Sequence, residues 1–468
     1  MIVECSVDFR LHRRAPLLVA LALAGVSVTG CLGADVDGQE AGDGPAARPE
    51  ADLSPAVRVE SDAELSRMRK HLASRYDEAD VAHAFTLPSG DAVDCVALER
   101  QPGLRRAEMR GHAIAAPPSA PVPEGAAEAP PDVEGTEAFL QPGRRDAAGV
   151  ELSCPEGTVP IRRVTIDDLA RYRTLEDRLL KSPRDLDGGA ARDPSQGHLF
   201  LGQPAASGIE APLYGPTSTH QYAHAAQHNL HNVGAHTRIN VWNPHVQAST
   251  EFSLSQLWVV GGSGGNLQTL EAGVQKYVNL YGNAEPHLFI YSTSDGYGPA
   301  GCYNLDCGRF VQISNTALIG ATLSPSSITG GAQYEMELAW FLSSGNWWLK
   351  VNGAWIGYYP GSLFNAAGLA SGASVIDFGG EIIDDRGQHG YHTYTAMGSG
   401  AYPAARWQKA AFQRNIWYYP NTTTAYHATG LTAYRDNAYC YDIALYNNDP
   451  SWGTYFFYGG PGYNTNCQ

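Results

Sequence analysis

The sequence predicts a mainly β protein, in which a small α+β domain precedes an antiparallel β-sandwich or barrel. From position 211 to the end, short strand-like runs alternate with clusters of turn-forming residues, a pattern typical of such all-β domains. The same stretch carries only 9 Lys+Arg and 14 Asp+Glu and is rich in Gly, Asn, Tyr, Ser and Trp. The capped helical patterns lie earlier, before position 186.

The first 30 residues have the pattern of an export signal. Arginines at positions 10, 13 and 14 precede an apolar run from 15 to 30, which is shorter than the roughly 20 residues that span a bilayer. The run ends in VTGC, which resembles a bacterial lipoprotein processing site with Cys31 as the lipidated residue. An ordinary secretory signal followed by a chance cysteine is the alternative. We therefore expect an exported protein, either held on the bacterial cell envelope as a lipoprotein or secreted after maturation. The only membrane association expected is through that lipid.

The next segments predict a tether, a small domain and a linker. Residues 31–55 are rich in Gly, Ala, Asp and Pro and predict a disordered tether. Residues 56–185 predict the α+β domain. Its first helix starts with a capping box at Ser61 and Glu64, a hairpin follows with its turn at 88–91, and a second capped helix runs from Thr165 through position 179. A Pro-rich insertion covers 113–135, and 186–211 predicts an exposed linker suited to maturation by proteolysis.

Charge and motif content exclude several functional classes. The formal net charge of −16 argues against a nucleic-acid partner, which would require a basic face. The second half has no HExxH or cysteine-peptidase signature, and we expect no cofactor and no metal. A run of histidines has spacings that would suit metal ligands on a helix, but the strand-like sequence after it favours solvated or pH-sensing side chains. These are His220, His224, His228, His231 and His236.

The cysteines predict disulfides. Cys5 and Cys31 lie in the leader, and the even number that remains in an exported chain is typical of a disulfide-bonded protein. Six cysteines allow fifteen connectivities. Proximity and the division into domains favour Cys95–Cys154, Cys302–Cys307 and Cys440–Cys467.

Two glutamates lie in glycine-flanked apolar runs. These are Glu271 in LQTLEAGVQKY and Glu381 in ASVIDFGGEII. Buried carboxylates are costly unless they are paired, hydrogen-bonded or protonated, so the two acids predict one site at which two carboxyls share a proton. A charged base beside a neutral acid would activate a water against a peptide carbonyl and then protonate the leaving nitrogen. The alternative is that one or both acids are structural. Among other acids, Glu335 and Glu337 alternate along a strand and are expected to face solvent.

Beyond its leader, the chain resembles the neprosin family of glutamic peptidases, whose members include an acid-active prolyl endopeptidase. The resemblance rests on long blocks in a fixed order. In the second half they are INVWNPHV (239–246), EFSLSQLWVVGG (251–262), LEAG (270–273), YGNAEPHLFIYSTSDGY (281–297), GCYNLDCGRFVQ (301–312), WWLKVNG (347–353), GYYPGSLF (357–364) and FGGEI (378–382). In the first half they are DCVALERQPGL (94–104) and CPEGTVPIRR (154–163).

The resemblance implies a β-sandwich at 212–468 with Glu271 and Glu381 as the catalytic pair on its concave face. It implies that residues 56–185 are an activation domain, which keeps the enzyme inactive until acid triggers its self-removal and which is thus a partner in cis. It also implies the last two of the three disulfides.

The implied substrates are polypeptides, including proline-rich ones, cut after proline. A proline side chain would fit an apolar slot lined by aromatic residues. Large aromatic residues mostly fill sandwich cores, so a core position is the alternative for each candidate. The candidates are Trp258, Tyr277, Trp347 and Tyr434.

The alternative function is a non-catalytic surface module, a lectin-like sandwich that binds glycan or peptide, in which the two carboxyls would lie far apart. A glycosidase would need them roughly 5–10 Å apart beside a sugar-shaped groove. The separation of the two carboxyls therefore helps to discriminate among the hypotheses.

Overall fold

The computed structural model describes residues 50–54, 57–119, 133–181, 219–385 and 390–468. All of them belong to one compact unit, Ala47–Gln468. The leader with Cys31, most of the tether, the middle of the Pro-rich insertion and the whole linker at 186–211 lie outside the described residues. Within the described ranges, no helix is both long enough and apolar enough to cross a bilayer.

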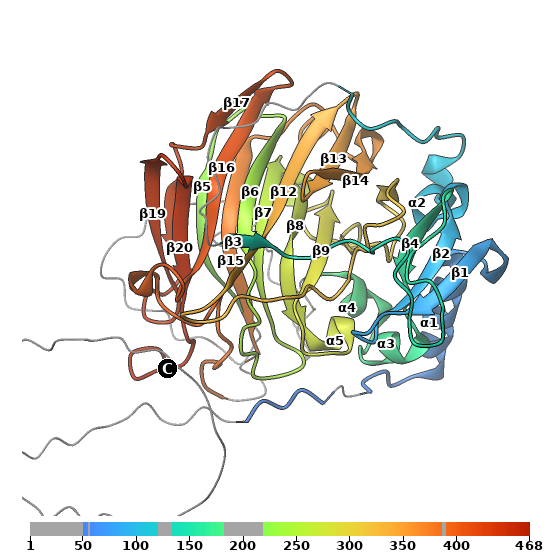
Figure 1. Cartoon of the computed structure of the whole chain (residues 1–468), viewed down its shortest axis with the longest axis horizontal. Helices are drawn as coiled ribbons and strands as arrows, with labels where there is room; N and C mark the ends of the chain where they lie inside the picture. Colours follow the sequence, from blue (N-terminus) through green and yellow to red (C-terminus); the bar gives the residue numbers. More distant parts are fainter. Residues whose placement is uncertain (1–49, 55–56, 120–132, 182–218, 386–389) are drawn as a thin grey trace, which may run out of the picture. The chain divides into compact units, whose positions relative to one another are not determined.

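The strand-like runs after position 218 form a seven-stranded antiparallel sheet in the order β10-β9-β8-β7-β15-β5-β18 (Figure 1). Three central strands, β7, β8 and β15, are buried along their whole length. Strands buried on both faces lack the simple polar–apolar alternation of a half-exposed sheet. The strands are β5 (Thr219–Gln227), β7 (Phe252–Gly261), β8 (Gln268–Tyr277), β9 (His287–Thr293), β10 (Cys302–Tyr303), β15 (Val375–Asp384) and β18 (Thr432–Arg435).

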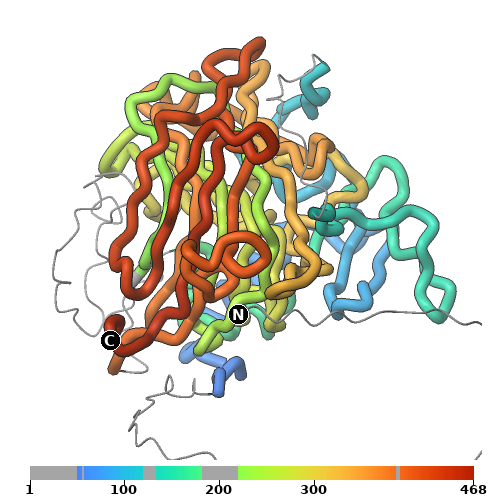
Figure 2. The backbone as a smooth tube through the Cα atoms, turned by 60° about the vertical axis from the view of Figure 1, so that its left-hand side comes forward, coloured from blue at the N-terminus to red at the C-terminus, as the bar shows by residue number. Residues whose placement is uncertain are grey.

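A ten-stranded sheet packs against the first, as Figures 1 and 2 show. Its main path is β11-β14-β13-β12-β6-β16-β20-β19, with β17 beside β16 and β3 beside β12. A hairpin with its turn at Asn352-Gly353 joins β13 to β14, and both turn residues have positive φ. The strands are β3 (Val133–Gly135), β6 (Gly234–Asn240), β11 (Val311–Gln312), β12 (Gln333–Ser343), β13 (Asn346–Val351), β14 (Ala354–Pro360), β16 (Ala411–Asn421), β17 (Thr424–His427), β19 (Asp442–Asp449) and β20 (Gly453–Gly459).

The last residues of the Pro-rich insertion, Val133–Gly135, form the short strand β3. β3 pairs in parallel with residues 333–335 of β12. This pairing is available because β13 joins β12 only from Leu338 onward, which leaves the start of β12 without a partner on that side.

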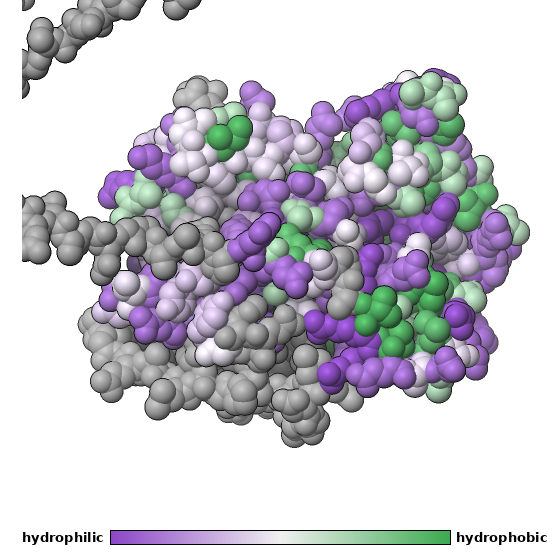
Figure 3. Space-filling model, turned by 90° about the horizontal axis from the view of Figure 1, so that it is seen from below, coloured by the Kyte–Doolittle hydropathy of each residue, from purple (hydrophilic) through white to green (hydrophobic). Residues whose placement is uncertain are grey.

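The main hydrophobic core lies between the two sheets and confirms the predicted sandwich. Leu257 and Ala272 from the first sheet and Trp340 and Ile356 from the second are all buried in it. On β8, residues 270, 272 and 274 enter this core, so the side chain of Glu271 between them projects to the opposite face. Outside the cores, hydrophobic residues occur in small groups, as Figure 3 shows for the face seen from below.

Residues 57–119 and 133–181, called the activation domain from here on after the role that the resemblance implies, form the expected small α+β arrangement beside the β9 end of the first sheet (Figure 1). Helix α1 (Asp62–Arg75) begins after Ser61, whose hydroxyl accepts a hydrogen bond from the backbone of Glu64. β1 (Val81–Thr86) and β2 (Ala92–Ala97) form the predicted hairpin, to which β4 (Thr158–Arg162) adds a third strand. Short helix α2 (Pro102–Arg105) follows the hairpin.

The second expected helix is divided in two. Thr165 and Asp168 form the predicted capping box and start α3 (Ile166–Ala170), but Thr174 and Asp177 form another and start α4 (Leu175–Leu179). An N-cap residue has extended backbone, so one continuous helix cannot pass through Thr174. α4 ends two residues before Lys181, the last described residue of this domain.

Three disulfides are present among the described residues, and they join the pairs that proximity favoured in the sequence. Cys95–Cys154 lies within the activation domain. Cys302–Cys307 and Cys440–Cys467 lie within the sandwich.

Candidate active site

Glu271 and Glu381 project from the same face of the seven-stranded sheet and meet there. Glu271 is opposite Trp258 of β7, and Glu381 is opposite Leu254 of the same strand, so one strand separates them. The Oε2 atoms of both glutamates lie 2.6 Å from Nζ of Lys181. The two oxygens are therefore at most 2 × 2.6 Å, or 5.2 Å, apart.

Lys181 reaches this point from the end of α4. Its ammonium lies 5.4 Å from the centre of the Trp258 ring, a cation–π distance, and its backbone N–H donates to the hydroxyl of Tyr291 at 3.3 Å. The side chains of Lys181 and both glutamates are at most 2% exposed. A cation from the activation domain thus fills the space between two buried carboxylates of the sandwich.

Neutral donors complete the surroundings of Glu271. The hydroxyls of Tyr297 and Thr269 donate to its Oε1 at 2.8 and 2.9 Å, while Lys181 donates to Oε2. Burial and the adjacent carboxylate raise the pKa of Tyr297 well above its usual value, so this phenol remains a neutral donor.

Glu381 has more partners. Gln256 donates to Oε2 at 2.8 Å, and His220 and Tyr222 donate to Oε1 at 2.5 and 3.3 Å. Burial acts to raise the pKa of Glu381, but Lys181 and His220 outweigh it and hold that pKa below its usual range. Burial likewise opposes the charge on Lys181, yet the two glutamates raise the pKa of its ammonium.

The glycines beside both glutamates leave room for neighbouring backbone. A Cβ at Gly273 would lie 2.0 Å from the carbonyl oxygen of Ser255 and 2.8 Å from Gln256, the residue that donates to Glu381. A Cβ at Gly379 would lie 2.5 Å from the carbonyl oxygen of Ala223 on β5. These glycines allow the close strand approach that brings the glutamates together.

Three of the four aromatic candidates share the face of the glutamates. Trp258 lies beneath Lys181, and half-buried Tyr434 stacks on His224 with ring centres 5.3 Å apart. Tyr277 lies at the far end of β8, in the same cluster as Tyr172 of the activation domain. Trp347 lies instead in the core between the sheets, where its indole N–H donates to the carbonyl of Leu369. Trp347 therefore takes the core position that was its alternative.

The histidines of the run are not all exposed to solvent, and they do not lie together as the ligands of one metal site would. His220 and His224 alternate along β5 on the face of Glu381. His224 is 1% exposed and lies 2.8 Å from Asp377; burial opposes its charge, but Asp377 raises the pKa of His224. His236 belongs to the other sheet, where burial lowers its pKa.

The expectation that Glu335 faces solvent is wrong. It is 4% exposed and accepts hydrogen bonds from Arg414 at 2.6 Å and Arg238 at 3.1 Å. Those arginines come from β16 and β6, so no local pattern in β12 indicates the pairing.

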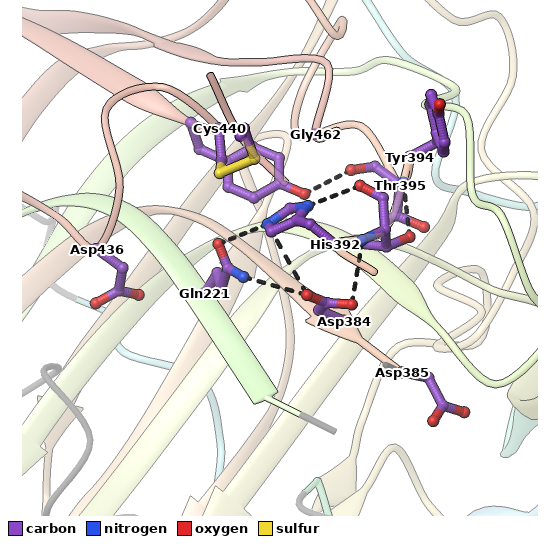
Figure 4. Close-up of polar contacts among 12 residues, drawn as sticks. Gln221, Asp384, Asp385, His392, Tyr394, Thr395, Asp436, Cys440 and Gly462 are labelled. Carbon is purple, nitrogen blue, oxygen red and sulfur yellow. Dashed lines mark hydrogen bonds and ion pairs between the residues drawn. A yellow bond between two sulfur atoms is a disulfide. The ribbon is translucent and has the colours of Figure 1, made fainter. Parts of the chain in front are cut away.

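Another buried polar network lies at the end of β15 (Figure 4). His392 contacts Gln221 at 3.1 Å and Asp384 at 3.9 Å, beside the Cys440–Cys467 disulfide. His392 and the two sulfurs are close enough together to hold a metal. Both cysteines are oxidised in the disulfide, however, so they offer no thiolate ligand.

Sequence reasoning missed Lys181, Gln256 and Tyr297. Gln256 carries a weak signal, because it is the polar residue between Leu254 and Trp258 on one face of a buried strand. Lys181 carries none, since its role depends on how the activation domain docks.

Comparisons with known proteins place two family profiles on the chain. The profile described as Neprosin matches residues 249–461, and that described as Neprosin activation peptide matches residues 84–226.

Solved structures give weaker similarities. Two structures of scytalido-glutamic peptidase with transition state analogs are 9% identical; each match covers 52% of this chain and 98% or 100% of the other, with TM-scores of 0.29 and 0.30. CG-16, a homodimeric agglutinin from chicken liver, is 9% identical over 34% of this chain and 93% of its own, with a TM-score of 0.20. These similarities are too weak to support an inference.

We predict that Gly273→Ala destabilises the protein by about 1–3 kcal/mol, because the added methyl group overlaps the backbone of β7. Urea unfolding measures the change. Gly265→Ala is the matched control, since nothing lies within 4 Å of a Cβ there. Equal stability of the two variants would contradict the close strand approach.

Proposed function

This chain belongs to the neprosin family of glutamic peptidases, and we propose that it is an exported, acid-active endopeptidase made as a self-processing zymogen. In this proposal Glu271 and Glu381 are the catalytic pair. The observation that supports it most is the single nitrogen 2.6 Å from an oxygen of each. The three disulfides support export, because such bonds persist in oxidising compartments.

The space that Lys181 fills suits a water molecule. An ammonium and a water are similar in size, and a water there would hydrogen-bond to both carboxyls. Once Lys181 leaves, two adjacent carboxyls share one proton. The ionised one takes a proton from the water, whose oxygen attacks the peptide carbonyl. The protonated one donates to the developing oxyanion, and a proton then passes to the leaving nitrogen. The shared proton belongs to the pair rather than to either residue.

Two features of the activation domain explain why the proposed precursor is inactive: the position of Lys181 and the packing of Tyr172. Lys181 occupies the position of the attacking water, and its charge holds Glu381 ionised, so the pair lacks the acid that the reaction requires. Tyr172 of the same domain packs in the aromatic cluster on the glutamate face, which supports a role for this domain in covering the site.

The chain also favours processing within one molecule. Lys181 and His220 lie on either side of positions 182–218 in the sequence, and both contact Glu381. The described residues on either side of this stretch therefore both contact the glutamate pair of the same chain. The sequence of this stretch contains prolines at 183, 194, 204, 212 and 216, which suits the proposed preference for cleavage after proline.

The alternative hypothesis of a non-catalytic binding module required the carboxyls of Glu271 and Glu381 to lie far apart. The nitrogen of Lys181 contacts both of them, which argues against that alternative. A spacing of at most 5.2 Å between the nearest oxygens does not by itself exclude a glycosidase. Family membership favours the peptidase.

We predict that Glu271→Gln and Glu381→Gln each reduce acid self-processing and peptide hydrolysis by at least about a thousandfold, because an amide can neither accept the water's proton nor donate a carboxyl proton. Gel analysis and a peptide assay measure the losses. Glu285→Gln, at an exposed position, is the matched control. Wild-type processing in either active-site variant would discard the mechanism.

We predict that processing begins only below the usual glutamate pKa of about 4.3. The pKa of Glu381 is lowered in the docked state, so the stabilisation of docking is present above that usual value and is lost as pH falls through the lowered one. Lys181→Met removes the interaction and should move the midpoint of processing to higher pH.

The midpoint is measured by incubating full-length chain across a pH series. Lys409→Met, at an exposed lysine, should leave it unchanged. A Lys181→Met profile that coincides with that of the wild type would contradict the inhibitory role of this lysine.

We predict that mass spectrometry of the acid-released fragments finds carboxyl termini at one or more of the five prolines between 183 and 216. Cuts restricted to other residues would contradict the proposed specificity without touching the role of the glutamates.

A further inference from the structure

A cavity of about 400 Å³ lies between the activation domain and the sandwich. Neither glutamate lines it. One wall comes from α1, α2 and α4, and the other from residues 299–309, the loop that contains the Cys302–Cys307 disulfide. The charged groups in its lining are strongly unbalanced: one carboxylate, Asp306, faces the four arginines Arg75, Arg105, Arg106 and Arg309.

Asp306 is already fully engaged. Its two oxygens lie 3.3 Å from Arg75 and 2.9 Å from Arg178, and the side chains of both arginines are at most 4% exposed. One carboxylate between two guanidinium groups balances only one of the two charges, and Asp168, which also acts to raise the pKa of Arg178, is itself paired with Arg171.

Arg309 provides a second buried positive charge. It is 5% exposed and donates to the hydroxyl of Ser294 at 3.1 Å. No carboxylate among the described residues forms an ion pair with it. Burial lowers the pKa of Arg309, and nearby Arg106 adds to the effect. Arginine nevertheless stays charged in proteins, so this buried guanidinium keeps a positive charge, which the attraction of nearby Asp295 offsets only in part.

The remaining two arginines have only weak partners. Arg105 pairs with Asp77 and Arg106 with Glu108, but these carboxylates are 60% and 45% exposed, and exposed pairs are weak enough for an anion in the cavity to compete for the arginines. Arg106 also reaches across to the sandwich and donates to the carbonyl of Cys307 at 3.1 Å. The wall of the cavity therefore carries a net positive charge contributed by both domains.

We propose that this cavity is a binding site for a multiply charged oxyanion, a phosphate or sulfate group, held between the two domains. Guanidinium forks match the oxygens of such groups and bind them through charge-assisted hydrogen bonds. The volume lies in the range of small-molecule sites and leaves room for an organic portion attached to the anion.

The position of the site links it to latency. Arg75, Arg105 and Arg106 belong to the activation domain and Arg309 to the sandwich, so the complete site exists only while the two are docked. Leu179 of α4 lines the cavity, two residues before the lysine between the glutamates. A ligand that binds only the docked state stabilises it by mass action, so an anion at ten times its Kd should slow acid processing about tenfold. This consequence rests on the proposed function, whereas anion binding does not.

Thermal unfolding of the full-length chain at neutral pH tests the binding. Low millimolar sodium phosphate and sodium sulfate are compared with sodium chloride at equal ionic strength, because high concentrations of these anions stabilise proteins generally. We expect a saturable rise in Tm with phosphate, sulfate or both; which of them acts identifies the preferred group. The rise should be lost in Arg309→Gln and kept in Arg145→Gln, which removes an exposed arginine that does not line the cavity.

The Tm values measured in sodium chloride show whether Arg309 binds the anion or instead stabilises the fold itself. Arg309→Gln should unfold at or above the wild-type Tm there, because it removes a buried charge that is only partly compensated. A lower Tm in chloride, or an equal anion response in Arg309→Gln and wild type, would overturn the site. If the anion binds but processing proceeds at an unchanged rate, the link to latency fails while the proposed peptidase chemistry stands.

Discussion

The structure depends on one ammonium group placed between two buried carboxylates. Two such carboxyls cannot lie together in a dry site unless a cation lies between them or they share a proton, which leaves only one of them charged. In the full-length chain the cation is Lys181, 2.6 Å from an oxygen of each glutamate. In the proposed mature enzyme the proton takes its place. In this proposal, the same electrostatic requirement explains both the inactivity of the precursor and the chemistry of the mature enzyme.

The sandwich meets this requirement through strands that are buried on both faces. One face of β7, β8 and β15 forms the core against the second sheet, and the other carries the glutamates beneath the activation domain. Removal of that domain would re-expose the carboxylates to water. Charged groups of the two domains meet in two places: a lysine enters an acidic site, and arginines from both domains surround a cavity with one carboxylate. We therefore propose that docking is sensitive both to protons and to anions.

The sequence predicted what depends on local pattern or on long ordered blocks. The mainly β fold, the β1–β2 hairpin and the three disulfides were all expected, and the two glutamates were expected to meet. What was missed depends on contacts between distant segments. Lys181 lies 90 residues from Glu271, and Glu335 is buried because arginines from two other strands reach it. The helix at Thr165 was predicted too long because the second capping box, at Thr174, was not recognised.

The most direct test is a high-resolution crystal structure of the processed chain at acidic pH. It should show one water within about 2.6–3.2 Å of an oxygen from each glutamate, at the point where the precursor holds the nitrogen of Lys181. Carboxyls that have moved too far apart for one water to bridge them, or another side chain filling that point, would contradict the account.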